Sequence, residues 1–238
     1  MPRLLLCVAI VGAGLCSSSS GQSGPPQDPA ADQHHHLILK NELVRVFAVN
    51  IPEGQQVYVR HQLNFLTVTL DDGRIVMWSE GTIPGMVFAV HAGDARFFLG
   101  RAALGMRNDA KTEYRNITIE FFDPRVTNYG YQQPSGEGFG YASTAPGPPP
   151  DDRSGFVHAV PLHSAAVRDV RLLPGELLPA ADRAVKELVI AVTDLNLQSK
   201  SGVDFKKQGG EIAWLNTPTT GLINRGTSTA RFVIVEFL

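Results

Sequence analysis

Cysteine is scarce in this chain of 238 residues. The two cysteines, Cys7 and Cys16, both lie close to the amino terminus. The rest of the sequence therefore has no disulfide framework, no thiol nucleophile and no cysteine-based metal site. Charged residues are also few, at 18%, and they nearly balance to a formal net charge of -2. That balance excludes the strongly basic surface that is typical of nucleic-acid binding and an acidic tail.

No apolar run is long enough to span a membrane as a helix, which needs about 20 residues. The one candidate, residues 4–15, follows a basic start and precedes the small residues 17–21. This pattern is typical of a secretory signal peptide. We therefore expect residues 1–21 to be a signal peptide and the mature protein to be exported, to the periplasm or the medium, without a transmembrane helix. Cys16 leaves a lipoprotein open as an alternative, although Leu15 stands where such signals usually carry Gly, Ala or Ser.

Long segments with helical periodicity are also missing, whereas Gly and Pro are abundant, at 23 and 16 residues. Short apolar stretches end at turn signals. Residues 44–49 lead to the turn at residues 52–54, and residues 65–70 stop at Asp-Asp-Gly. Many short strands at this spacing predict an all-β sandwich or barrel. Residues 22–36 are polar and of low complexity, and they predict a flexible tether before the first strand.

The sequence repeats itself once. Features of the first half recur about 116 residues later: Gly93, Asn108 and residues 116–122 return as Gly210, Asn224 and residues 232–238. Residues 188–193 likewise echo residues 65–70. A repeat of this length indicates a duplicated domain. We predict two related units at residues 37–122 and 157–238, joined by a Pro-, Gly- and Tyr-rich connector at residues 123–156.

Common catalytic signatures are missing as well. The sequence has no Gly-x-Ser-x-Gly nucleophile elbow and no glycine-rich phosphate loop that opens a helix. Paired carboxylates occur at Asp71-Asp72 and Asp151-Asp152, but in turn sequences, where Asp is usually solvated. No residue is therefore predicted to be catalytic.

The order of turns and strands in each copy resembles the cupin family. A Pro and Gly turn follows a strand, paired strands come next, and Gly followed by Asp or Glu opens a further strand that leads to Asn. Cupins are small jelly-roll barrels, so the resemblance implies an all-β bicupin with two cupin-like jelly-roll barrels. In cupins, two short motifs supply three His and one Glu that converge on a divalent metal inside the barrel.

The second copy departs from the family's metal motifs. Counted from Gly175, the three ligand places of the first motif fall on Ala181, Arg183 and Glu187. Only Glu187 is a residue of the family's ligand type. The His place of the second motif falls on Thr220 or Gly221.

The first copy departs from the motifs in a similar way. Counted from Gly54, the places of the first motif fall on Arg60, Gln62 and Leu66, and a shift of one residue brings His61, Leu63 and Thr67 there instead. The His place of the second motif falls on Leu104. One family-type ligand in each copy cannot hold a metal against water, so we expect no metal and no cofactor.

Four residues remain as ligand-binding candidates: Tyr58, His61, Arg183 and Glu187. If Arg183 and Glu187 both point into the second barrel, they form a buried ion pair whose guanidinium could grip a carboxylate or polar ligand. A salt bridge on the rim of the barrel is the alternative. His61 with Tyr58 could act similarly in the first copy.

Three hypotheses for function follow from these observations. The leading one is an exported bicupin that binds a small molecule or a partner protein without catalysis. The second is a metal-dependent cupin isomerase, oxygenase or hydrolase with a non-standard site. The third is a structural dimerisation module, in which case the protein forms a homodimer.

Overall fold

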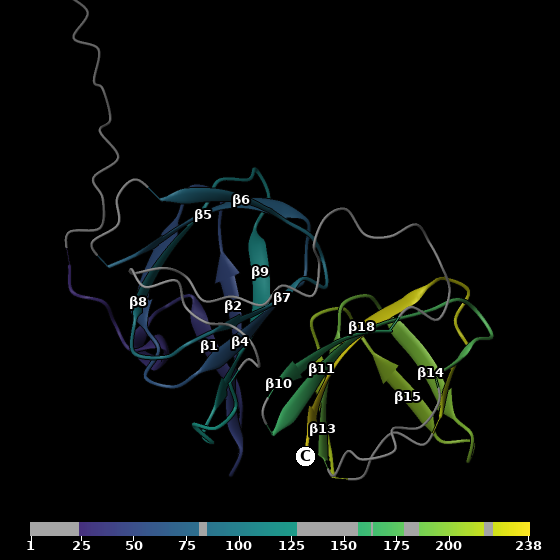
Figure 1. The fold of residues 1–238 in the computed structure, drawn as a ribbon. Coiled ribbons are helices and arrows are strands. Elements are labelled where there is room, and N and C mark those ends of the chain that lie inside the picture. Colours follow the sequence, from purple (N-terminus) through teal and green to yellow (C-terminus); the bar gives the residue numbers. More distant parts are fainter. Residues whose placement is uncertain (1–23, 81–84, 128–156, 163, 179–185, 217–220) are drawn as a thin grey trace, which may run out of the picture.

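The computed structural model describes residues 24–80, 85–127, 157–162, 164–178, 186–216 and 221–238. The expected signal peptide, Cys16, Arg183 and most of the predicted connector lie outside the described residues. Within them, the chain forms eighteen β-strands and one short 3₁₀-helix, arranged as two barrels (Figure 1). No helix in this part of the chain is long and apolar enough to cross a membrane. The predicted all-β fold class is confirmed.

The first barrel consists of two antiparallel sheets. The five-stranded sheet has the order β1-β2-β9-β4-β7, and the four-stranded sheet has the order β3-β8-β5-β6. In chain order the strands are β1 (His35–Lys40), β2 (Val44–Ile51), β3 (Gln56–Arg60), β4 (Phe65–Thr69), β5 (Gly73–Ser79), β6 (Met86–Val90), β7 (Ala95–Phe98), β8 (Ala103–Asn108) and β9 (Tyr114–Phe121). Strands that are far apart in the sequence, such as β2 and β9, therefore lie side by side.

The second barrel repeats this arrangement strand for strand. Its sheets have the orders β10-β11-β18-β13-β16 and β12-β17-β14-β15. In chain order the strands are β10 (Val157–Leu162), β11 (Ala165–Leu172), β12 (Leu177–Leu178), β13 (Lys186–Ala191), β14 (Leu195–Ser199), β15 (Asp204–Lys207), β16 (Ile212–Leu215), β17 (Leu222–Asn224) and β18 (Ala230–Phe237). The predicted duplication is thus confirmed by the sheet order.

Matching turns carry the same hydrogen bonds in both barrels. Gly54 and Gly175 have φ of 69° and 82°, a conformation that glycine adopts at little steric cost. Their amides donate to the backbone carbonyls of Asn108 and Asn224 at 3.0 and 2.8 Å. The side-chain amides of the two asparagines each donate to two backbone carbonyls at 2.7–2.9 Å. The predicted equivalence of Asn108 and Asn224 is therefore confirmed.

Strand pairing corrects one step in the alignment of the two copies. Phe65 lies opposite Glu120 in the first barrel, and Glu187 lies opposite Glu236 in the second. Because Glu120 and Glu236 occupy the same place in the repeat, Phe65 is the counterpart of Glu187. The match of residues 188–193 with residues 65–70 is wrong by one residue. A slip of one residue exchanges the two faces of a strand, so this correction decides which side chains point into the barrel.

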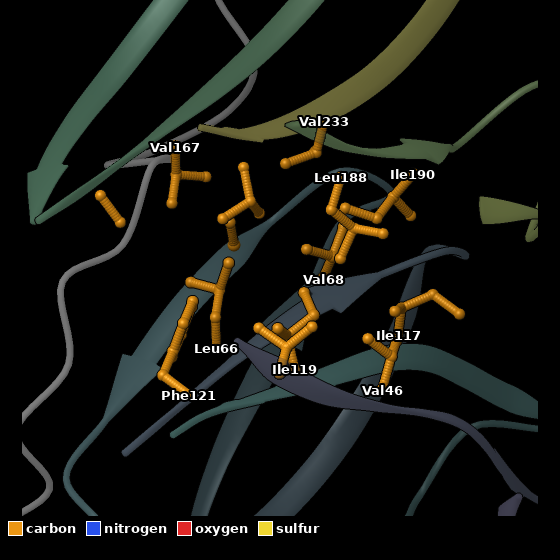
Figure 2. Packing of buried hydrophobic residues seen from close by; sticks show 14 of the residues in the cluster. Val46, Leu66, Val68, Ile117, Ile119, Phe121, Val167, Leu188, Ile190 and Val233 are labelled. Atoms are coloured by element: carbon orange, nitrogen blue, oxygen red, sulfur yellow. The ribbon is translucent and has the colours of Figure 1, made fainter. Parts of the chain in front are cut away.

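The two barrels pack face to face through their five-stranded sheets. Alternate residues of these sheets point away from the barrel interiors and form one shared apolar core. Figure 2 shows Leu66, Ile119 and Phe121 of the first copy facing Val167 and Leu188 of the second. The central strands of both sheets are consequently buried on both faces.

Residues 24–36 follow a defined path, where the sequence predicted a flexible tether. Gln27 forms a parallel bridge to β3. Asp28 caps the 3₁₀-helix η1 (Pro29–Ala31), because its side chain accepts a hydrogen bond from the first turn, and it also pairs with Arg45 at 3.6 Å. The cap orders the segment locally, and the bridge of Gln27 and the ion pair of Asp28 hold it against the first barrel.

Candidate functional site

Each barrel holds charged side chains at one end of its interior. Phe121 and Phe237 belong to the core shared by the two barrels. The residues before them, Glu120 and Glu236, therefore face the opposite way, into their own barrels. Both glutamates are buried. The two interiors thus share a carboxylate at the same place in the fold, but its partners differ.

In the first barrel Glu120 links Arg45 and His61. Its Oε1 accepts a hydrogen bond from Nδ1–H of His61 at 2.8 Å, and its Oε2 accepts one from Nε of Arg45. Arg45 lies opposite Glu120 on β2. His61 is only 2% exposed, and its ring stacks on Phe65 with 3.8 Å between centroids. The carboxylate therefore fixes the tautomer and orientation of a histidine that is packed into the core.

Burial determines the charge of His61. Burial has the largest effect on the pKa of His61 and lowers it below 6.5. The hydrogen bond to Glu120 and the negative charge of Glu120 act in the opposite direction and raise this pKa. For Glu120 burial alone would raise the pKa, but the hydrogen bonds from His61 and Arg45 outweigh it, and the pKa lies below 4.5. At neutral pH the network therefore contains a neutral imidazole, a carboxylate and a guanidinium.

The lowered pKa of His61 predicts how stability depends on pH. The unfolded chain binds the proton first, so the stability that neutral His61 contributes is present above pH 6.5 and is lost as the pH falls toward the folded-state pKa. Relative to His61→Gln, the wild-type protein should lose up to about 1.4 kcal/mol of unfolding free energy per pH unit below 6.5. Urea unfolding at a series of pH values measures both proteins, and parallel pH profiles would contradict the prediction.

In the second barrel Glu236 lies close to Arg168 and Glu187. The Nη2 atom of Arg168 is 2.7 Å from Oε1 of Glu236 and 3.8 Å from Oε1 of Glu187. Glu187 and Glu236 are direct partners on the neighbouring strands β13 and β18. The side chains are 0% exposed for Glu187, 12% for Glu236 and 14% for Arg168. Two carboxylates therefore face one guanidinium in a largely dry environment.

Protonation of Glu236 is favoured by this environment. Burial, the largest influence, raises the pKa of Glu236 above 4.5, the positive charge of Arg168 opposes the rise, and the negative charge of Glu187 adds to it. The Nε atom of Arg168 is buried and has no hydrogen-bond partner among the described residues. A donor without a hydrogen-bond acceptor and a carboxyl group with a raised pKa thus lie in one cluster.

The interior next to this cluster differs between the two barrels. In the first barrel the rings of Phe65 and Phe98 stack at 4.9 Å between centroids within a buried apolar cluster. In the second barrel the interior is mainly aliphatic. Three of the four residues of β7 are buried, whereas every residue of its counterpart β16 is half-exposed. The second barrel is therefore the less tightly covered of the two along this strand.

No known family's sequence profile matches the chain, and no curated protein matches it. Solved structures match it in fold. A cupin 2 conserved barrel domain protein from Leptotrichia buccalis is 12% identical with a TM-score of 0.52, over 86% of this chain and 88% of that one. A putative glyoxylate-induced protein from Pseudomonas aeruginosa is 14% identical with a TM-score of 0.59. The match covers 86% of this chain and 80% of that one. The chain has the cupin fold.

An enzyme is among the structures that this bicupin fold resembles. A variant of oxalate decarboxylase from Bacillus subtilis is 11% identical with a TM-score of 0.56, over 83% of this chain and 69% of that one. At these identities the likeness concerns the fold alone. Because one fold hosts many unrelated functions, the decision between catalysis and binding depends on the side chains in the barrels.

The cupin metal motif maps onto this bicupin with a corrected register. Glu187 lies at the family's Glu place, and its counterpart in the first barrel is Phe65. The motif count places Leu66 or Thr67 at that position. Leu104, at a His place, is buried in the apolar interior. In the second barrel a guanidinium lies beside Glu187 and would repel a divalent cation. The described residues contain no group of three or more His, Cys, Asp or Glu that could hold a metal ion, so they do not fit the family's metal.

The predicted ligand-binding residues have different outcomes. His61 and Glu187 lie in the polar clusters of the first and second barrels. Tyr58 lies between two buried residues of β3 and is half-exposed, so its side chain points outward, whereas His61 is buried. Arg183 lies outside the described residues, and its pairing with Glu187 stays a prediction. The guanidinium that the structure places beside Glu187 belongs to Arg168.

Sequence reasoning missed four members of these clusters: Arg45, Glu120, Arg168 and Glu236. A signal for the two glutamates was present. Residues 116–122 and 232–238 each contain one Glu in an otherwise largely apolar strand, at the same place in the repeat. Because an isolated charge is costly to bury, a charge that recurs inside two buried strands indicates a polar site within each barrel.

Proposed function

We propose that this bicupin is an exported protein that binds a small polar molecule, without catalysing a reaction, at the Arg168–Glu187–Glu236 cluster of the second barrel. Export rests on the signal-peptide pattern of residues 1–21. Binding rests on one observation, that two buried glutamates lie directly opposite each other on neighbouring strands.

Two carboxylates in this arrangement are costly to bury. Each loses its hydration, and each raises the energy of the other's charge. Apolar residues of similar volume usually give equal or greater stability than a buried ion cluster, and the first barrel has Phe65 at the place of Glu187. The second barrel thus has a second carboxylate where the first barrel has an apolar ring, and such clusters of buried charges are typical of sites that recognise a polar ligand.

The charges of the cluster define the class of ligand. Glu187 and Glu236 accept hydrogen bonds, so they suit an ammonium group or several hydroxyl groups. Arg168 has a donor atom, Nε, without a partner among the described residues, so it suits an oxygen acceptor on the same molecule. A small amine that also carries an oxygen acceptor, such as an amino acid or an amino alcohol, complements the charges of the cluster.

A ligand panel tests this proposal on the mature protein. Thermal unfolding with amino acids, amino alcohols and polyols should identify a compound that raises the melting temperature, since a ligand at 100 times its Kd stabilises by about 2.7 kcal/mol. Glu187→Gln and Glu236→Gln should each weaken its binding at least about tenfold, or about 1.4 kcal/mol. Glu53→Gln, in an exposed turn of the first barrel, is the matched control and should bind normally.

Two results would contradict binding at the cluster. One is a stabilising ligand whose affinity neither glutamine variant changes. The other comes from elemental analysis of the same preparations, which separates binding from the metal-dependent enzyme. A stoichiometric, tightly held transition metal that disappears in Glu187→Gln would support the enzyme and reject the proposal.

A further inference from the structure

The outward face of the four-stranded sheet in the first barrel carries an aromatic row. Tyr58 on β3, Gly105 on β8 and Trp78 on β5 lie side by side across the three strands. Val57 and Met77 precede the two aromatic residues and belong to the interior cluster. Because successive residues of a strand alternate between faces, Tyr58 and Trp78 point outward, and both are half-exposed.

The indole of Trp78 lies directly over Gly105. A Cβ atom on Gly105 would be 1.9 Å from Cε2 and 2.1 Å from Nε1 of Trp78, so no other residue fits beneath the ring where it lies. Glycine in the interior of a strand weakens the strand and commonly marks a close approach. Here glycine lets the indole ring of Trp78 lie against the backbone of β8. The ring therefore forms part of the outward surface of the sheet.

Hydrogen-bonding side chains border this ring on both sides. Arg60 and Glu80 form an ion pair of 2.7 Å, and both side chains are exposed. Arg60 ends β3 and Glu80 directly follows β5, and both lie at the level of Ala103 on β8. On the other side of the ring, Gln56 and Arg107 are paired neighbours on β3 and β8. The face thus combines an aromatic floor with charged and amide groups at its border.

We propose that this face binds a pyranose ring of a glycan, with Trp78 as the stacking residue. One face of a pyranose presents C–H groups that are apolar and match the negative face of an indole. The hydroxyl groups project sideways, where Arg60, Glu80, Gln56 and Arg107 can donate and accept hydrogen bonds. The net charge of -2 disfavours nucleic acid as the ligand.

Affinity electrophoresis of the full mature chain tests the proposal in gels that contain laminarin, xylan, dextran or glycol chitin. At least one polymer should retard the wild-type protein, and Trp78→Ala should weaken that retardation at least tenfold. The chain has two tryptophans, so in Trp214→Phe the fluorescence reports Trp78 alone. We expect that emission to shift to the blue when the retarding sugar is added. This site is separate from the cluster in the second barrel, so either test can fail alone.

Two variants keep the experiment decisive. Trp78→Phe preserves a smaller ring and should bind with intermediate affinity. Phe122→Ala removes an exposed ring elsewhere on the barrel and should leave retardation unchanged. Free migration of the wild-type protein in all four gels, or retardation that Trp78→Ala does not reduce, would overturn the proposal. A dimer that becomes a monomer in Trp78→Ala on size-exclusion chromatography would also overturn it, because the face would then bind a second copy.

Discussion

Replacing Glu120 by alanine should lower the free energy of unfolding by about 3–5 kcal/mol, the usual cost of removing one partner from a buried ion pair. Glu120 is fully buried and accepts hydrogen bonds from both His61 and Arg45. Alanine would leave a guanidinium and an imidazole N–H at this end of the first barrel without their acceptor. Urea unfolding followed by circular dichroism measures the loss.

Two comparisons separate charge from packing. Arg74 and Asp109 form an exposed ion pair at 3.3 Å, and Arg74→Met should change stability by less than about 1 kcal/mol. Combining Glu120→Leu with Arg45→Met and His61→Phe removes every charge of the network and should recover most of the stability that Glu120→Ala loses. If Glu120→Ala costs no more than Arg74→Met, the network is hydrated and does not hold the barrel together.

The turns of both barrels could be predicted from the sequence, because turn chemistry is local. Gly54 and Gly175 adopt a positive φ that favours glycine over other residues. Asn108 and Asn224 each hold the neighbouring backbone by the same pair of hydrogen bonds. These features recur at a fixed spacing, so the duplication and the class of fold followed from them.

The register of the central strands could not be predicted in the same way. All five residues of β4 are buried, because one face lines the barrel and the other packs on the second copy. A strand buried on both faces forms a continuous apolar run, without the alternation that shows which residues point inward. The slip of one residue placed Leu66 where Phe65 lies.

The candidate site was predictable only in part. Glu187 followed from the spacing of the cupin motif. Arg168 and Glu236 lie near it because β11, β18 and β13 are neighbours in the sheet, and motif spacing contains no information about sheet order. The face on which Tyr58 lies could not be decided from the sequence, because a single strand of alternating residues fits either orientation until its neighbours are known.

Ile119→Asp should leave neither barrel folded at room temperature. Ile119 is fully buried in the core shared by the two barrels (Figure 2). Loss of the isoleucine side chain costs about 2–5 kcal/mol, and an unpaired buried carboxylate adds to that cost, while a whole domain is stable by only about 5–15 kcal/mol. Ile38→Asp, at a position 44% exposed, is the matched control and should remain folded by circular dichroism.

The milder Ile119→Ala tests whether the two barrels unfold as one unit. Trp78 lies in the first barrel and Trp214 in the second, so Trp214→Phe and Trp78→Phe backgrounds each report one barrel by fluorescence. The shared core contains side chains from both copies, so a cavity at Ile119 weakens the support of both. We expect one common urea midpoint, lowered in both backgrounds by a stability loss of about 2–5 kcal/mol. Two separate midpoints, with only that of the first barrel lowered, would mean that the copies are independent domains and that the shared core is not needed to fold either one.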